Sequence, residues 1–193
     1  MNRPAGVFVH ERALLETDMV GEGTRIWAFA HVLSGARIGR GCNVCDHAFI
    51  EGDVSLGNDV TVKNGVLIFD RVTIEDEVFI GPGTVFTNDR VPRISSPRQP
   101  PNLLSTLVRR GATLGANVTV LCDLAIGARA FVAAGAVVTG DVPPHALMVG
   151  NPARRVGWVC SCGRRLPESL RCECGHAFGF AGESEGLEPV PAT

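Results

Sequence analysis

The sequence predicts an all-β protein: a parallel β-helix of hexapeptide repeats, with one long projecting loop and a short cysteine-rich segment at its C-terminal side. Three observations predict this: an aliphatic residue that recurs every six positions, a proline-rich interruption, and two closely spaced pairs of cysteines. The composition agrees, because 45% of the residues are hydrophobic, only 6% are aromatic and 23 are glycine. Such a chain folds, and thin layers of Val, Ile, Leu and Ala build its interior.

The repeat occupies every sixth position over residues 20–86 with Val, Ile, Leu or Phe, without a miss. Four residues after each anchor from Val20 to Ile80, the residue is small or β-branched, and the same pattern resumes over residues 108–138. A period of six fits neither an α-helix nor an ordinary strand and is typical of a β-helix, in which each hexad is a short strand plus a corner. Three hexads then make an 18-residue coil, and coils stack at about 4.8 Å.

The interruption, residues 87–107, contains four prolines and cannot follow the ladder of strands. Long loops that leave a repeat scaffold commonly carry function. We therefore expect an arm that reaches over a site or onto a neighbouring subunit, and a tolerated disordered insertion is the alternative.

The cysteine-rich segment, residues 159–181, contains two Cys-x-Cys pairs, one residue shorter than the usual zinc-ribbon spacing: Cys160, Cys162, Cys172 and Cys174. Four thiolates suit a closed tetrahedral zinc site, and so short a segment needs the metal to fold. An iron site or free thiols are the alternatives, and His176 is a possible substitute ligand. Residues 182–193 are acidic and contain proline, which predicts a mobile tail.

The formal net charge of −2 gives no broad electrostatic reason to bind nucleic acid. Apolar stretches are much shorter than the roughly 20 residues that span a bilayer, and charged residues near the N-terminus precede any apolar core, so we expect no export signal. We therefore expect a cytoplasmic protein with reduced thiols, without membrane insertion and without a nucleic-acid partner.

Four strings resemble those of the hexapeptide-repeat acyltransferases, whose fold is a left-handed β-helix: GTRIWAFAHV (23–32), IEDEVFIGPGTVFTND (74–89), VRRGATLGANVTVLC (108–122) and ALMVGNPARRVGW (146–158). The resemblance defines an acyltransferase domain over residues 1–158. It is strongest to N-acetyltransferases of nucleotide-linked 3-amino sugars, such as those that make UDP-2,3-diacetamido-2,3-dideoxy-glucuronate. The chain departs from them at Ala28, where the family often has a second histidine, and in the loop after Asn88.

The resemblance implies acetyl-CoA-dependent N-acetylation of a sugar 3-amino group by a homotrimer that holds CoA between neighbouring β-helices. An exposed face with Trp27, Phe49 and Phe79 would favour such subunit contacts. A dTDP-3-amino-deoxyhexose acetyltransferase and an O-acetyltransferase of a small acceptor are alternatives. A metal-containing scaffold or binding protein is the non-enzyme alternative.

Acetyl transfer needs a neutral amine against the thioester, a donor for the oxyanion and a groove for pantetheine, while a strong base is optional. By resemblance, Asn88 corresponds to an active-site Asn that orients the amine; a turn residue that launches the loop is the alternative. His31 should point outward as a base or substrate contact, although a lone His is more often structural. Asp70 occupies the same corner as Asn88 one coil earlier, and we assign it to substrate binding together with Asn64 and Arg93.

Small residues in the last coils predict an open groove for the pantetheine arm: Gly115, Ala116, Ala133 and Ala134. The CoA nucleotide carries phosphates, for which bidentate arginine is well suited. By resemblance, Pro152, Arg154 and Arg155 lie where the family meets this nucleotide. A solvated surface charge is the alternative for each arginine.

Overall fold

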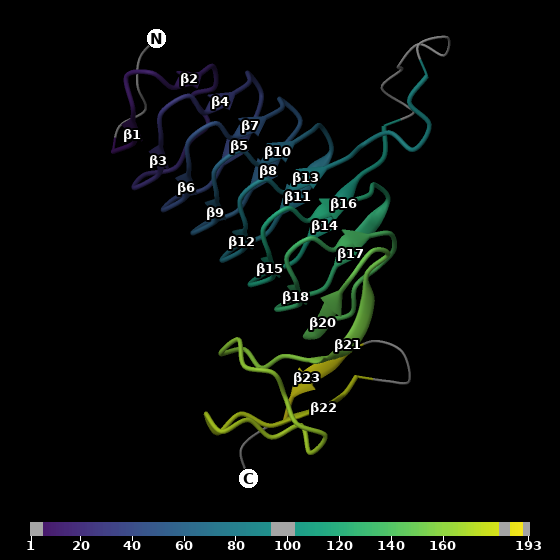
Figure 1. The fold of residues 1–193 in the computed structure, drawn as a ribbon. Helices are drawn as coiled ribbons and strands as arrows, with labels where there is room; N and C mark the ends of the chain where they lie inside the picture. The colour runs from purple at the N-terminus through teal and green to yellow at the C-terminus, as the bar shows by residue number, and fades with distance from the viewer. Residues whose placement is uncertain (1–5, 94–102, 182–185, 191–193) are drawn as a thin grey trace.

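The computed structural model describes residues 6–93, 103–181 and 186–190. Every regular element in these ranges is a β-strand, and β1 to β20 wind into a three-sided parallel β-helix (Figure 1). The coils stack one after another from the N-terminus, drawn in purple, toward the C-terminal part of the chain. The predicted hexapeptide β-helix is therefore confirmed. Among the described residues, no helix of the length and apolarity needed to cross a membrane occurs.

Three sheets form the sides of the β-helix, and each takes one strand from successive coils. Sheet A contains β1 (Phe8–Val9), β3 (Arg25–Ile26), β6 (Asn43–Val44), β9 (Thr61–Val62), β12 (Phe79–Ile80), β15 (Thr113–Leu114), β18 (Phe131–Val132), β20 (Ala146–Val149) and β21 (Arg154–Trp158). Sheet B contains β2 (Leu14–Leu15), β4 (His31–Val32), β7 (Phe49–Ile50), β10 (Leu67–Ile68), β13 (Val85–Phe86), β16 (Thr119–Val120) and β19 (Val137–Val138). Sheet C contains β5 (Arg37–Ile38), β8 (Ser55–Leu56), β11 (Val72–Ile74), β14 (Thr106–Val108) and β17 (Leu124–Ile126).

The strand register follows the predicted coil length. Thr61 pairs with Phe79, which is 18 residues later. Phe79 then pairs with Thr113, which is 34 residues later, so the interruption adds 16 residues to one coil. The 18-residue spacing returns between Thr113 and Phe131. The loop is therefore an insertion that leaves the stacking of the coils intact.

The predicted inward positions form the core. Every anchor over residues 20–86 is at most 9% exposed, and the small residues four positions further on are also buried. Phe86 is the largest of the side chains that are fully buried. Close contact between coils explains a glycine after an anchor on sheet C, because a Cβ on Gly39 would lie 2.3 Å from the carbonyl oxygen of Gly57.

The inserted loop leaves the β-helix after β13 and returns at β14, so its predicted boundary at residue 107 extends two residues into a strand. Residues 94–102 lie outside the described residues. At its returning end, Arg71 Nη1 donates a hydrogen bond of 2.8 Å to the carbonyl oxygen of Leu103. At its outgoing end, Arg90 forms an ion pair with Asp123 over 3.2 Å. Contacts with the coils therefore hold both ends of the loop.

The C-terminal module, residues 159–181 and 186–190, packs on the last coil through a small core of its own: Cys160, Leu166, Cys172, Phe178 and Leu187. Its strands β22 (Phe178–Phe180) and β23 (Leu187–Pro189) pair antiparallel. The amide of Leu187 donates to the carbonyl of Pro144 over 3.2 Å. The predicted mobile tail is therefore wrong for residues 186–190, because the buried Leu187 completes this core; residues 182–185 and 191–193 lie outside the described residues.

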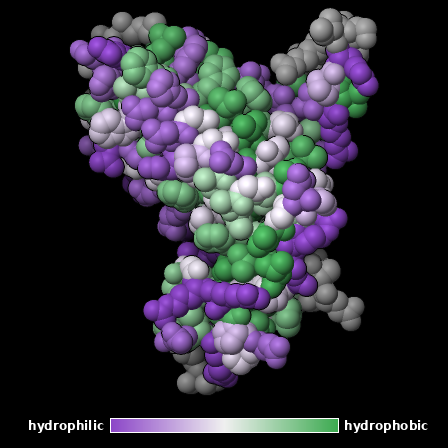
Figure 2. Space-filling model, viewed as in Figure 1, coloured by the Kyte–Doolittle hydropathy of each residue, from purple (hydrophilic) through white to green (hydrophobic). Residues whose placement is uncertain are grey.

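The junction between the β-helix and the C-terminal module is apolar. Buried His145 lies against Phe178 with ring centroids 4.8 Å apart, and Trp158 packs against both cores. Figure 2 shows hydrophobic surface continuing over the last coils to this junction. The module therefore covers the C-terminal end of the β-helix, where unpaired coil edges would otherwise be exposed.

Candidate active site and metal centre

Small residues line one corner of the β-helix, where sheet A turns into sheet B. Gly115 and Ala116 follow β15, and Ala133 and Ala134 follow β18 one coil later. The two layers touch, since a Cβ on Gly115 would lie 2.5 Å from the amide nitrogen of Ala134, and the amide of Gly135 donates to Ala116 over 2.8 Å. The structure thus brings the four predicted groove residues together, with no side chain larger than a methyl group.

Strand β21 turns the two predicted phosphate-binding arginines to opposite faces. Arg154 pairs with Val149 of β20 and Arg155 pairs with Met148, with a bulge next to this pair. Directly opposite residues share a face, so Arg154 lies on the outer face with exposed Val149, and Arg155 lies on the face of buried Met148. There the guanidinium of Arg155 stands 4.2 Å from the ring centroid of Trp158. Arg154 therefore shares the outer face of the small-residue corner, whereas Arg155 does not.

Asn88 lies at the mouth of the loop and is only 2% exposed. Its Nδ2 donates to the carbonyl oxygen of Asp70 over 3.4 Å, and its own carbonyl accepts a hydrogen bond of 2.9 Å from the amide of Leu104. The Asp70 carboxylate is occupied elsewhere, because its Oδ1 accepts from the amide of Asp53. Asn88 and Asp70 are thus neighbours, as the coil spacing predicts, but the contact runs through the backbone of Asp70. These contacts support the turn that launches the loop.

His31 lies on the outer face of sheet B near the N-terminal end and pairs with Glu16. Its Nε2 lies 2.9 Å from Glu16 Oε1, and about a third of each side chain is exposed. The hydrogen bond with His31 is the main cause of a lowered pKa at Glu16. The ring also contacts Phe49 edge-on, with centroids 5.6 Å apart. His31 is therefore an oriented, accessible imidazole, with a carboxylate on one nitrogen.

The remaining predicted site residues lie at three separate places. Asn64 is exposed in the same A-to-B corner as Ala116, earlier along the stack, and its Nδ2 donates to Asp46 over 3.3 Å. Pro152 is exposed between β20 and β21, near the foot of that corner. Arg93 is exposed in the described part of the loop. In this single chain, Arg93 contacts none of the other predicted site residues through a described hydrogen bond.

One hollow on the described surface lies away from the small-residue corner. It measures about 780 Å³ and is formed at the N-terminal end by the first coil, including His10, Glu16 and Met19. Because this end is the open edge of the stack, a hollow there follows from the fold itself. The chemistry predicted for the last coils does not depend on it.

The three aromatic side chains predicted for one exposed face do not share a face, and only Trp27 and Phe79 are exposed, which corrects the sequence prediction. Trp27 and Phe79 extend from sheet A, whereas Phe49 belongs to β7 of sheet B and packs against Phe69. Trp27 also contacts exposed Phe8, with centroids 5.3 Å apart. Phe49 is half-buried, so the three rings do not share one side of the prism, and the exposed ones lie on or next to sheet A.

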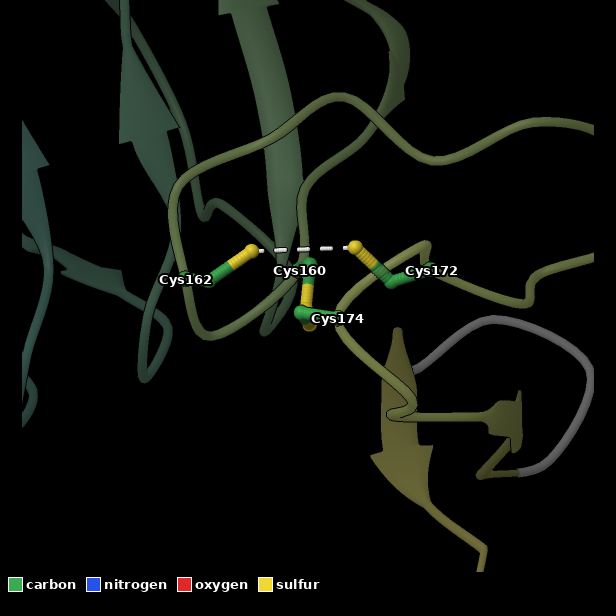
Figure 3. Close-up of side chains that lie close together, drawn as sticks. All are labelled: Cys160, Cys162, Cys172 and Cys174. Atoms are coloured by element: carbon green, nitrogen blue, oxygen red, sulfur yellow. Dashed lines mark hydrogen bonds between the residues drawn. The ribbon is translucent and has the colours of Figure 1, made fainter.

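The four cysteines of the C-terminal module converge, as Figure 3 shows. Their sulfur atoms all lie within 4.8 Å of one another, with 3.5 Å between Cys160 and Cys174 and 3.6 Å between Cys162 and Cys172. A tetrahedral zinc ion with Zn–S bonds of about 2.3 Å separates its sulfur ligands by about 3.8 Å. The donor set and its spacing therefore fit a structural zinc ion.

The thiols of this cluster differ in protonation. Burial raises the pKa of Cys160 to about 12, whereas a hydrogen bond from His176, whose Nδ1 lies 3.1 Å from the sulfur, lowers the pKa of Cys174 to about 5. Metal binding needs all four as thiolates. His176 thus contacts a predicted ligand instead of replacing one.

Comparisons with known proteins agree with this geometry. The family model for bacterial transferase hexapeptide (six repeats) matches residues 19–52. The chain is also 50% identical over 177 residues to dTDP-3-amino-3,6-dideoxy-alpha-D-galactopyranose 3-N-acetyltransferase of Aneurinibacillus thermoaerophilus, covering 90% of this chain and 91% of that protein. The chain belongs to the hexapeptide-repeat acetyltransferases. Serine acetyltransferase 4 of Arabidopsis thaliana is 39% identical over 64% of the chain and 28% of that protein.

Solved structures share the fold of this acetyltransferase. A mutant of perosamine N-acetyltransferase from Caulobacter crescentus, in complex with CoA and GDP-perosamine, superposes with a TM-score of 0.60 at 24% identity, over 72% of this chain and 57% of that one. A mutant of AntD, an N-acyltransferase from Bacillus cereus, in complex with dTDP and coenzyme A, gives a TM-score of 0.59 at 15% identity, over 79% and 82% of the chains.

The structure gives two residues of this acetyltransferase contacts near the proposed site residues that the sequence did not predict. Glu16 precedes the first anchor of the regular repeat, so the hexad pattern gave no reason to place it beside His31. Arg165 lies in the cysteine-rich segment, yet its Nη2 donates to the carbonyl of Val156 in β21 over 3.0 Å. The only sequence signal for Arg165 was its place between the two cysteine pairs.

Proposed function

We propose that this acetyltransferase transfers the acetyl group of acetyl-CoA to the 3-amino group of a dTDP-linked 3-amino-3,6-dideoxyhexose. The observation that carries the proposal is the 50% identity, over nine-tenths of both chains, to an enzyme named for that reaction. It favours the dTDP-sugar alternative over the UDP-glucuronate derivative to which the sequence motifs first pointed. The CoA and nucleotide ligands of the two structural relatives are consistent with the same pair of substrates.

In this proposal, the pantetheine arm of CoA lies along the small-residue corner and its diphosphate lies near Arg154. The corner supports this because Gly115, Ala116, Ala133 and Ala134 leave the backbone accessible, and a flat, narrow arm needs such access. A guanidinium binds phosphate oxygens in a bidentate manner. Arg154 is exposed on the same outer face, at the foot of the corner.

The length of the pantetheine arm determines at which coil of the β-helix the thioester lies in this proposal. About a dozen bonds join the diphosphate to the sulfur, which spans roughly 15 Å when extended, or about three strand steps of about 4.8 Å. Three steps from β21 along sheet A lead to β15, and a fourth leads to β12, whose coil contains Asn88. His31 belongs to the coil of β3, seven steps from β21. The thioester is therefore expected near Asn88 and far from His31.

At this level the neutral sugar amine attacks the thioester carbonyl. The new C–N bond forms, the C–S bond breaks, and the proton lost by the nitrogen goes to the departing thiolate or to water, giving an amide and free CoA. Because a neutral amine is a sufficient nucleophile, positioning supplies most of the acceleration. We assign Asn88 a positioning role, since it fixes the mouth of the loop that borders the site. Asp70, Asn64 and Arg93 remain the proposed sugar-nucleotide contacts.

We further propose a homotrimer in the cytoplasm, where acetyl-CoA and nucleotide sugars are made. The exposed rings of Phe79 on sheet A and Trp27 next to it would be covered by a neighbouring subunit, and closed cyclic symmetry pairs two different surfaces in this way. The described ends of the loop, residues 87–93 and 103–105, would then lie toward a neighbouring subunit. Light scattering should give three times the chain mass of 20.4 kDa.

We also propose that residues 159–181 form a structural zinc module. Cys160, Cys162, Cys172 and Cys174 would hold the ion, which supplies cross-linking and no chemistry of the reaction. The small core of the module supports this proposal, because few apolar residues other than the cysteines are buried there.

The reaction is tested by incubating the protein with acetyl-CoA and a panel of dTDP- and UDP-linked 3-amino sugars while a thiol reagent reports CoA release. We expect turnover with a dTDP-linked 3-amino-3,6-dideoxyhexose and much less with the matching 3-hydroxy sugar. A folded protein that releases no CoA with any amine would refute the enzyme proposal. Turnover only with UDP sugars would return the assignment to the first alternative.

A further inference from the structure

The metal module brings an arginine to the same surface as Arg154. Arg165 lies in the module, and its Nη2 donates to the carbonyl oxygen of Val156 over 3.0 Å. A Cβ built on Gly157 would lie 3.3 Å from Arg165 Nε, so this side chain covers the position where a side chain of residue 157 would project. Gly157 pairs with Leu147, which in turn pairs with Phe131 on the outer face of sheet A. The Arg165 guanidinium therefore lies on that outer face.

Arg154 and Arg165 occupy neighbouring positions on the outer face, near the foot of the groove. Arg154 is paired with Val149, two residues from Leu147 on β20, so the two positions are about 6.6 Å apart along the strand. The pairing of β18 with β20 stacks Val149 on Ala133, which itself stacks on Gly115, so Val149 is the next position after these small residues. The two arginines thus flank the end of the surface on which the pantetheine arm is proposed to lie.

Both guanidinium groups have donors to spare. Arg165 uses one N–H on Val156, and Arg154 uses one on the carbonyl of Ala153 over 3.0 Å. Among the described residues, neither forms an ion pair with a carboxylate, although six other ion pairs occur there. Each guanidinium has five N–H donors in a planar fork. Two exposed forks on one face suit an organic diphosphate or a phosphomonoester.

The first cysteine turn fixes Arg165 in place. The amide of Cys160 donates to the carbonyl of Arg164 over 2.8 Å, residues 159 and 165 form an antiparallel bridge, and the amide of Leu166 donates to Trp158 over 2.8 Å. Cys160 and Cys162 of this turn are two of the four proposed metal ligands. Metal binding and the position of Arg165 are therefore linked through one short turn.

We propose that Arg165 is a phosphate-binding residue for the nucleotide of CoA, acting with Arg154, so that the metal module completes the cofactor site. This inference rests on the proposed acetyl-CoA dependence. A nucleotide sugar also carries a diphosphate, but the foot of the small-residue groove favours CoA.

The test compares Arg165→Gln with Arg164→Gln. Arg164 is a matched control, because its Nη1 is already paired with Glu173 Oε2 over 2.8 Å. For Arg165→Gln we expect the KM for acetyl-CoA and the Kd for CoA to rise about tenfold, with kcat, metal content and the KM for the nucleotide sugar little changed. Arg165→Lys, which keeps the charge but not the fork, should recover part of the loss. Comparing CoA with dephospho-CoA shows whether the 3′-phosphate is the group bound.

Equal KM values for acetyl-CoA in Arg165→Gln and Arg164→Gln would overturn the inference while leaving the proposed reaction intact. A rise confined to the KM for the nucleotide sugar would also overturn it and would reassign Arg165 to the other diphosphate. If calorimetry finds no CoA binding to the wild-type protein, both the inference and the proposed function fail. If Arg165→Gln loses metal, the control is wild-type protein from which the metal has been removed, because it keeps Arg165. An equal rise in its KM for acetyl-CoA would assign the effect to the metal module alone and overturn the role of the Arg165 side chain.

Discussion

Replacing His31 by Ala should leave acetyl transfer nearly unchanged at saturating substrates, although an exposed His beside a carboxylate resembles a catalytic base. The coil of His31 lies seven strand steps from β21, which is about 34 Å at about 4.8 Å per step. An extended pantetheine arm bound at Arg154 covers roughly 15 Å of that separation. With the diphosphate at Arg154 as proposed, the imidazole would be out of reach of the amine that attacks the thioester.

A catalytic and a non-catalytic His31 predict clearly different values of kcat for His31→Ala. Loss of a general base costs about 10²-fold to 10⁴-fold in rate, whereas we expect kcat for His31→Ala to stay within about twofold of wild type. The assay is steady-state thiol release over a range of pH, with both substrates saturating. Glu16→Gln is the matched control, because it removes the carboxylate that lies 2.9 Å from His31 while keeping the ring.

A fall of about a hundredfold in kcat with an intact β-helix, together with loss of the acidic limb of the pH profile, would refute the reasoning from cofactor reach. The thioester would then lie near the first coils, and Arg154 would not hold the diphosphate. A change in the KM for the nucleotide sugar alone would instead place His31 at the far end of the acceptor.

Four further predictions concern turnover, metal and stability. Asn88→Ala should abolish most turnover while gel filtration and circular dichroism stay as in wild type, and wild-type activity would remove its positioning role. Cys160→Ser should lose the bound zinc measured by elemental analysis, whereas Cys45→Ser, outside the cluster, should retain it; unchanged zinc in the first variant would contradict the metal site. Phe86→Ala should lower the free energy of unfolding by about 3–5 kcal/mol because it opens a cavity in a full core, against about 0.5 kcal/mol or less for an exposed substitution. Burial lowers the pKa of His145, so the unfolded chain binds a proton at a higher pH than the folded chain does. The free energy of unfolding should therefore rise with pH up to about 6.5, the usual pKa of histidine. Denaturant titrations of wild type and His145→Asn should show a smaller rise in the variant.

The sequence by itself determined the coil, the core and the insertion. Each hexad has to bury one anchor and turn at one small residue, so the period fixes which residues face inward, and the burial of residues 20–86 follows it throughout. The convergence of the two cysteine pairs could also be predicted, because four thiols at that spacing suit a closed tetrahedral metal site. These features depend on contacts that repeat every coil and therefore leave a periodic trace in the chain.

Only the tertiary structure decided which side chains meet across coils and beyond the repeat. Trp27 and Phe49 lie on different sides of the prism. Leu187, which follows the cysteine-rich segment, completes the core of the C-terminal module. The bulge in β21 places Arg154 on the outer face and Arg155 against Trp158, and the cysteine turn brings Arg165 to the outer face beside Gly157. A one-residue shift in a strand exchanges its two faces, so these placements depend on register and on a non-repeating turn. The hexapeptide period carries no information about either.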